Sequence, residues 1–101
     1  MSKNIKITFS ESAFRDLENV LEYYRDQQVA HVGDTLVGKI IKDVELLAEQ
    51  PDMGRIVPEF DLSYLRELIR PPFRIVYRRD HNIIRIVRIW RSDRLMVLPD
   101  A

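Results

Sequence analysis

The segment RRDHNIIRIVRIWRSDR, residues 78–94, combines six arginines with a run of β-branched and aromatic residues. Four of its arginines recur at steps of three residues: Arg85, Arg88, Arg91 and Arg94. A guanidinium group presents a planar fork of donors that binds phosphate or carboxylate in a bidentate manner. These residue types therefore indicate the binding of anions.

Positive charge is concentrated in the second part of the sequence. Residues 1–63 carry 7 Lys and Arg against 12 Asp and Glu, whereas residues 64–101 carry 9 Arg and no Lys against 4 acids. The net charge of zero is therefore the sum of −5 and +5. A surface that only has to be hydrated would mix Lys with Arg, so the exclusive use of arginine favours anion recognition.

Length and composition predict one domain over residues 1–101, because the chain is long enough for a single small core. The absence of cysteine excludes disulfides and thiolate metal sites. The two histidines, His31 and His81, lie far apart, so we expect neither a metal site nor a cofactor. No apolar run resembles a signal peptide or a membrane span, and we expect a soluble, cytoplasmic protein with no membrane partner.

The first half of the chain predicts a short strand and two helices. Alternation over residues 5–9 is typical of a half-buried strand. Ser10 is suited to cap a helix that runs to about Gln27 with an apolar stripe at steps of three and four. A second helix is expected from near Val32 or Asp34 to Gln50, where Pro51 ends it.

The second half predicts a loop followed by three strands. DMGRIVPEFD has the composition of a loop, and YLRELI, FRIVYR and IIRIVRIW read as strands. The turn residues at 80–82 predict a hairpin between strands 73–79 and 83–90. We therefore predict an α+β fold in the order β-α-α-β-β-β, with the N-terminal helical hairpin packed on one face of a mainly antiparallel four-stranded sheet.

Alternation along the strand 83–90 gives two faces that are both mostly apolar, as in a central strand. One face holds Ile83, Arg85, Val87 and Ile89, and the other holds Ile84, Ile86, Arg88 and Trp90.

The neighbouring strands add further arginines at even positions, which we expect on one side of the sheet: Arg66, Arg70, Arg74 and Arg78. The alternative is that these arginines are solvated heads on buried stems, paired with Glu67, Asp80 or Asp93.

Four segments in this order carry a resemblance to a known family: AFRDLENVLEYY, LLAEQPDMGRIVPE, YLRELIRPPFRIVYR and IIRIVRIWRSDRLM. Together they resemble the RelE/ParE superfamily of bacterial toxins from type II toxin–antitoxin modules, over about residues 5–97. The resemblance implies the same β-α-α-β-β-β fold, growth inhibition, and a cognate antitoxin whose C-terminal segment wraps the toxin.

RelE-like members resemble mRNA endonucleases that act in the ribosome. Such cleavage needs a proton acceptor, cations around the phosphate and an acid for the leaving oxygen. The resemblance implies Arg74, Arg91 and Arg94 as cations. The C-terminal residues LMVLPDA contain no Tyr or His where RelE-like toxins place their acid, which leaves Tyr77 or His81 as candidates.

ParE-like members resemble poisons that bind DNA gyrase and trap its broken DNA, as in plasmid stabilisation systems. They need a recognition surface but no set of groups for proton transfer. The long helical hairpin and the missing C-terminal acid favour this interpretation, with the RNase acting on ribosome and mRNA as the alternative. In either case we expect these residues to contact the target or antitoxin: Arg74, Arg85, Arg88, Trp90, Arg91 and Arg94.

Three candidate residues also have purely structural interpretations. Tyr77 shares its face with Phe73 and Ile75, which favours a core position. His81 is typical of a turn residue in the sequence Asp-His-Asn. Trp90 either stacks on a base or partner side chain or closes the core, and the size of its ring favours the core.

Overall fold

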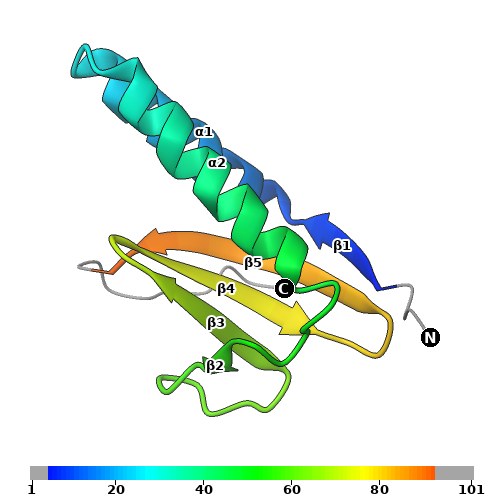
Figure 1. The fold of residues 1–101 in the computed structure, drawn as a ribbon. Coiled ribbons are helices and arrows are strands. Elements are labelled where there is room, and N and C mark those ends of the chain that lie inside the picture. The colour runs from blue at the N-terminus through cyan, green and yellow to red at the C-terminus, as the bar shows by residue number, and fades with distance from the viewer. Residues whose placement is uncertain (1–4, 93–101) are drawn as a thin grey trace.

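The computed structural model describes residues 5–92 and shows two helices packed against one face of a five-stranded sheet (Figure 1). The predicted α+β class and the packing of the helical hairpin on one face are confirmed. The elements in chain order are β1 (Lys6–Phe9), α1 (Glu11–Asp26), α2 (Ala30–Leu46), β2 (Arg55–Ile56), β3 (Leu65–Arg70), β4 (Phe73–Arg79) and β5 (Ile83–Arg91).

The strands lie in the order β1-β5-β4-β3-β2, so β5 is flanked on both sides as predicted for a central strand. β1 pairs with β5 in parallel, and the other pairs are antiparallel. The prediction of four strands was one short, because β2 lies within the segment predicted as a loop. Two residues are too few to show an alternating pattern, which explains why sequence periodicity missed this strand.

Helix α1 begins at the predicted cap, whereas α2 differs from the prediction at both ends. Ser10 caps α1 as expected, since its Oγ accepts a hydrogen bond from the Ala13 N–H (3.0 Å) and donates one to the Val87 carbonyl (2.7 Å). α2 begins earlier than predicted, at Ala30, and ends at Leu46 rather than Gln50. Leu47, Ala48 and Glu49 instead form turns, and Gln50 is not helical, because a proline disfavours helical geometry in the residue that directly precedes it.

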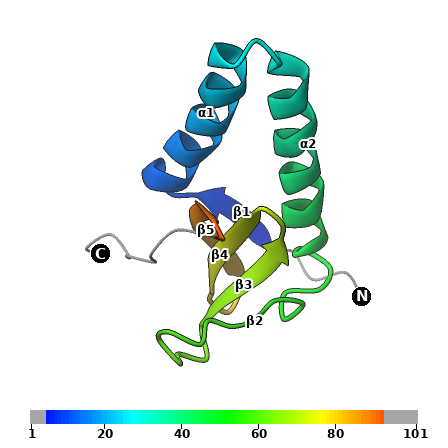
Figure 2. The same cartoon turned by 90° about the vertical axis from the view of Figure 1, so that its left-hand side faces the viewer.

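Hydrophobic side chains form two cores, one on each face of the sheet. The larger core lies between the sheet and the near ends of the helices, while the loop joining the helices lies farthest from the sheet (Figure 2). The smaller core lies on the opposite face, which we call the far face. It is made by Val57, Leu65, Val76 and Trp90, with Phe60 and Val87 packed against it.

The far-face core settles the structural role of Trp90. This side chain is buried, with 7% of its surface exposed, as favoured from the sequence. The segment after β2 supplies Val57 and Phe60, so it covers part of the far face rather than leaving that face to solvent. Tyr77 is likewise buried, in the larger core, as predicted.

At two places, side chains lie on another face of the sheet than the alternation of the sequence predicted. A two-residue turn joins β3 and β4, so that an even residue of β3 lies opposite an odd residue of β4, as Arg66 does opposite Tyr77. Arg66 and Arg70 therefore lie on the helix-facing side, and Arg74 and Arg78 on the far face. The expectation that all four even arginines share one side is wrong.

The second departure is a β-bulge in β5. Val76 of β4 pairs with Arg88 and the next residue, Tyr77, pairs with Ile86, so Val87 has no residue opposite it. An inserted residue reverses the alternation beyond it. Ile86 and Ile89 consequently both lie in the helix-facing core, although the sequence pattern had assigned them to opposite faces.

A buried contact fixes the segment between α2 and β2. The Tyr77 hydroxyl donates a hydrogen bond to the Pro51 carbonyl (2.8 Å) and accepts one from the Gly54 N–H (2.9 Å). A Cβ at Gly54 would lie 2.6 Å from the Glu67 carbonyl oxygen and 2.7 Å from the Tyr77 ring. Only glycine therefore allows this close approach of the two backbones.

Substitutions at two glycines should have opposite effects on the stability of the fold. Gly54→Ala should lower the free energy of unfolding by about 1–3 kcal/mol or more, because the new methyl group collides with backbone that cannot move away. Gly38→Ala is the matched control, since nothing lies within 4 Å of its Cβ position in α2. There the substitution should raise stability by about 0.5–1 kcal/mol through helix propensity. Urea denaturation of both variants measures this, and equal stabilities would contradict it.

Candidate functional site

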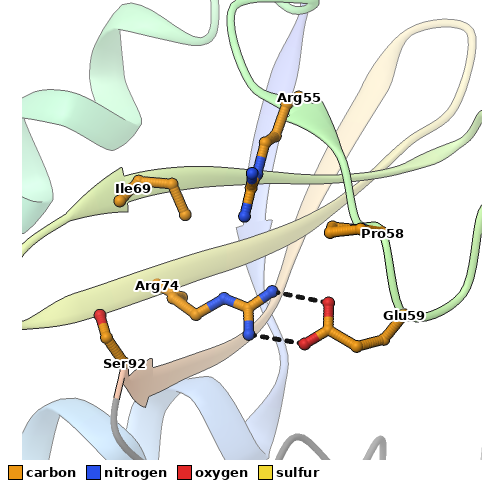
Figure 3. A pocket seen from close by; sticks show the side chains of 6 residues that line it. All are labelled: Arg55, Pro58, Glu59, Ile69, Arg74 and Ser92. Atoms are coloured by element: carbon orange, nitrogen blue, oxygen red, sulfur yellow. Dashed lines mark hydrogen bonds and ion pairs between the residues drawn. The ribbon is translucent and has the colours of Figure 1, made fainter.

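A cavity opens on the far face beside the end of the β3–β4 hairpin. It has a volume of about 600 Å³ and is lined by Arg55, Pro58, Glu59, Ile69, Arg74 and Ser92. These residues come from β2, the segment that follows it, β3, β4 and the residue after β5, as Figure 3 shows. We call this cavity the Arg74 pocket.

A buried carboxylate lies beneath the pocket. The Glu67 side chain is fully buried, and its two oxygens accept hydrogen bonds from Arg55 Nε (2.8 Å) and Arg74 Nε (2.6 Å). An ionised carboxylate inside a protein needs such partners, because burial removes its hydration. The two arginines therefore hold a charge that the sheet could not otherwise contain.

The remaining nitrogens of Arg74 are also engaged. Nη1 and Nη2 donate to the two oxygens of Glu59 at 2.8 and 2.9 Å, so the two groups face each other across the pocket (Figure 3). The hydrogen bonds to Glu59 and then Glu67 raise the pKa of Arg74 above its usual range. The hydrogen bond from Arg74 lowers the pKa of Glu59 to about 2. Arg74 is therefore a permanent cation neutralised by two carboxylates.

The residues predicted as possible acids lie away from this pocket. Tyr77 projects to the helix-facing side, where burial raises the pKa of its hydroxyl. His81 is exposed in the turn between β4 and β5, seven residues after Arg74 in the chain and hence about 20 Å away. The structure therefore does not bring Tyr77 or His81 together with the predicted cation Arg74.

Arg88 and Trp90 form a second cluster, at the edge of the sheet where β1 ends. Both oxygens of Asp16 accept hydrogen bonds from Arg88, at 2.8 and 3.0 Å, and one also accepts from the Ile89 backbone N–H (2.8 Å). The Arg88 guanidinium stacks over the Trp90 ring at 4.9 Å. The Arg88–Asp16 ion pair thus joins α1 to β5. Asp16 also accepts the hydrogen bond of the Ile89 N–H, because the pairing of β1 with β5 ends before this residue.

A groove of about 300 Å³ runs beside this cluster between α1 and β5. Arg91 lines it together with the half-exposed ring of Tyr23. Of the other predicted contact residues, Arg85 is exposed on the far face, and Arg94 lies outside the described residues. The predicted residues therefore fall into separate places, with Arg74, Arg85 and Arg91 in three different environments.

The pairing of arginines with Glu67 and Asp80, considered from the sequence, is present in the structure. Sequence reasoning missed the roles of Arg55 and Glu59, because both lie in the segment predicted as a loop and meet Arg74 only through the fold. Within residues 5–92, no group of three acidic or histidine side chains is arranged to hold a metal ion. Neither helix in that range is long and apolar enough to cross a membrane.

A family model described as "ParE toxin of type II toxin-antitoxin system, parDE" matches residues 7–96. No curated protein sequence matches the chain significantly.

Solved structures share the fold. A chain of the chromosomal ParDE system from P. aeruginosa superposes with a TM-score of 0.72 at 24% identity, covering 89% of this chain and 98% of that one. A chain of the RelBE2 toxin–antitoxin complex from Mycobacterium tuberculosis gives 0.65 at 18% identity, covering 87% and 98%. The YoeB dimer from Staphylococcus aureus gives 0.57 at 23% identity, covering 84% and 93%.

The Glu59 contact predicts a stability that depends on pH. The pKa of Glu59 in the folded protein, about 2, lies below its ordinary value of 4.5, so the ionised pair stabilises the fold above pH 4.5 and loses this effect as the pH falls toward 2. Because the Glu59 side chain is 43% exposed, solvent screening limits the contribution to about 1 kcal/mol or less. We expect Glu59→Gln to lower the melting temperature at pH 7 and to match the wild type near pH 2.

Glu11→Gln is the control for this experiment, since the Glu11–Arg15 pair is exposed on both sides and should affect melting less. A difference between Glu59→Gln and wild type that stays constant from neutral pH to pH 2 would contradict the assignment.

Proposed function

The chain belongs to the family of ParE toxins of type II toxin–antitoxin systems, and on this premise we propose that it arrests growth by binding DNA gyrase and trapping gyrase on broken DNA. We propose further that a cognate antitoxin binds it and holds it inactive. Such a poison acts by recognition and is not an enzyme.

The state of Arg74 is the observation that supports this proposal over an endonuclease. A cation that stabilises the charge developing on phosphorus must have donors directed at the phosphate in the transition state. All three nitrogens of Arg74 are bonded to Glu59 or Glu67. Three of the five N–H donors are used in this way, so a phosphate entering the pocket would compete with Glu59 for Nη1 and Nη2 and would lie beside the negative charge of Glu67.

Within residues 5–92, neither of the two acids predicted from the sequence lies beside the pocket. A general acid must come within hydrogen-bonding reach of the leaving oxygen. Tyr77 is buried on the opposite side of the sheet, and His81 lies at the far end of the hairpin. A gyrase poison needs neither group, so the geometry favours the gyrase target over the ribosome and mRNA.

Recognition then depends on the arginines that face outward. Arg74 and Arg88 hold the fold through buried or half-buried ion pairs, so we assign them a structural role. Arg85 on the far face and Arg91 in the groove beside α1 are the described candidates for contact with gyrase or antitoxin.

The first test is growth. Induction of this chain alone should stop colony formation by several orders of magnitude, and co-expression of the antitoxin encoded beside it should restore growth. The variant Gly54→Ala serves as a control that depends on folding, and its induction should be tolerated. Normal colony counts on induction of the wild-type chain would refute a growth-arresting toxin.

The second test identifies the target. Purified protein should inhibit supercoiling by gyrase and accumulate cleaved DNA, while ribosomes programmed with mRNA should show no cut in the A site. His81→Ala should retain full potency, because the exposed turn histidine has no part in a gyrase poison. Codon-positioned mRNA cleavage that His81→Ala abolishes would establish the endonuclease instead.

A further inference from the structure

Two arginines lie directly opposite each other on the far face of the sheet. Arg78 of β4 pairs with Arg85 of β5, and both side chains are exposed. Directly opposed residues of an antiparallel pair have Cβ atoms about 5 Å apart, and like charges in this position are destabilising. This pair of like charges therefore lowers the stability of the sheet, and packing within the sheet does not require it.

The surroundings of the pair extend its positive charge and add a flat ring. Arg78 stacks over the half-exposed ring of Tyr64 at 4.9 Å. On the other side, Thr8 of β1 lies opposite Arg85, and exposed Lys6 lies two residues away on the same face. We call the set Lys6, Tyr64, Arg78 and Arg85 the far-face patch.

Carboxylates do not neutralise this patch as they neutralise the rest of the sheet. Arg78 has one ion pair, to Asp80 at 3.3 Å, in which both side chains are about half exposed. Such a pair contributes at most about 1 kcal/mol and exchanges readily with other anions. Within residues 5–92, Arg85 makes no hydrogen bond or ion pair through its side chain. The patch thus keeps donors that an incoming anion can use.

We propose that the far-face patch binds the phosphodiester backbone of a nucleic acid. Two guanidinium forks side by side can bind one phosphate together or two successive phosphates, and arginine binds phosphate in bidentate fashion. The Arg78–Tyr64 stack offers a planar surface on which a base can continue the stacking. An acidic peptide would use the charges but not this surface. The inference rests on the proposed function, in which the bound backbone belongs to the DNA that gyrase holds.

Direct binding in the absence of gyrase tests this proposal. Fluorescence anisotropy would measure binding of the purified chain to a labelled duplex DNA and to a labelled single-stranded RNA from about 25 to 200 mM salt, a range over which phosphate contacts weaken strongly. The variant Arg78→Gln, Arg85→Gln should reduce the slope of log Kd against log salt by about 2, since two phosphate contacts are lost. The preferred probe, DNA or RNA, identifies the source of the phosphodiester.

The matched control removes the same charge from another surface. Arg15 and Arg25 are exposed on α1, so the variant Arg15→Gln, Arg25→Gln should keep the wild-type slope. Melting temperatures of both double variants should stay close to the wild type. Three results would overturn the proposal. The wild-type chain could show no salt-dependent binding, or both double variants could lose the same amount of DNA binding. Polyglutamate could also compete as strongly as DNA at equal charge.

A supercoiling assay on the same proteins separates this proposal from the gyrase function. In one outcome, the Arg78, Arg85 variant loses DNA binding and the wild-type chain leaves gyrase unaffected. This outcome would support the far-face patch as a DNA-binding surface and refute the gyrase target. A wild-type chain that poisons gyrase, together with an Arg78, Arg85 variant that binds DNA and poisons gyrase equally well, would refute the patch alone.

Discussion

The buried carboxylate of Glu67 is the constraint on which the far side of the sheet depends. It lies on β3, takes one hydrogen bond from Arg55 of β2 and another from Arg74 of β4, and is fully screened from solvent. Loss of one partner from a buried ion pair commonly costs about 3–5 kcal/mol, because the other charge stays buried without compensation. Arg74 also holds Glu59, so the same network anchors the segment that covers the far-face core.

This network limits the chemistry that the same residues can perform. An arginine fixed between two carboxylates is well suited to stabilise a fold, and poorly suited to receive a phosphate whose charge increases during a reaction. The side-chain types alone are compatible with both roles, since arginine, glutamate and tyrosine occur in structural networks and in nuclease sites alike. The difference lies in the bonding of Arg74 and in the burial of Tyr77, both of which are features of structural residues.

Periodicity predicted the helices, the N-cap at Ser10, the strands β4 and β5 and the class of the fold, because these depend on local patterns of apolar residues. The faces of the arginines depended on two details of one residue each. A two-residue turn places Arg66 and Arg74 on opposite sides, and the unpaired Val87 shifts the alternation of β5. A slip of one residue exchanges the faces of a strand, so periodicity alone could not place these side chains. The contact of Glu59 with Arg74 required the tertiary structure itself.

The bulge also explains one of the three-residue steps between the arginines. A step of three would reverse the face of a strand, but the extra residue Val87 leaves Arg85 and Arg88 both on the far face. The charge asymmetry of the sequence is largely resolved within the molecule, because acids of residues 1–63 pair with arginines of residues 64–101. The pairs are Asp16 with Arg88, Asp43 with Arg70, Asp52 with Arg66 and Arg79, and Glu59 with Arg74. Intramolecular carboxylates therefore account for most of the anions that the sequence led us to expect. Arg78 and Arg85 lie outside this pairing between the two parts of the chain, and for them an external anion is the simplest physical reason to face each other across two strands.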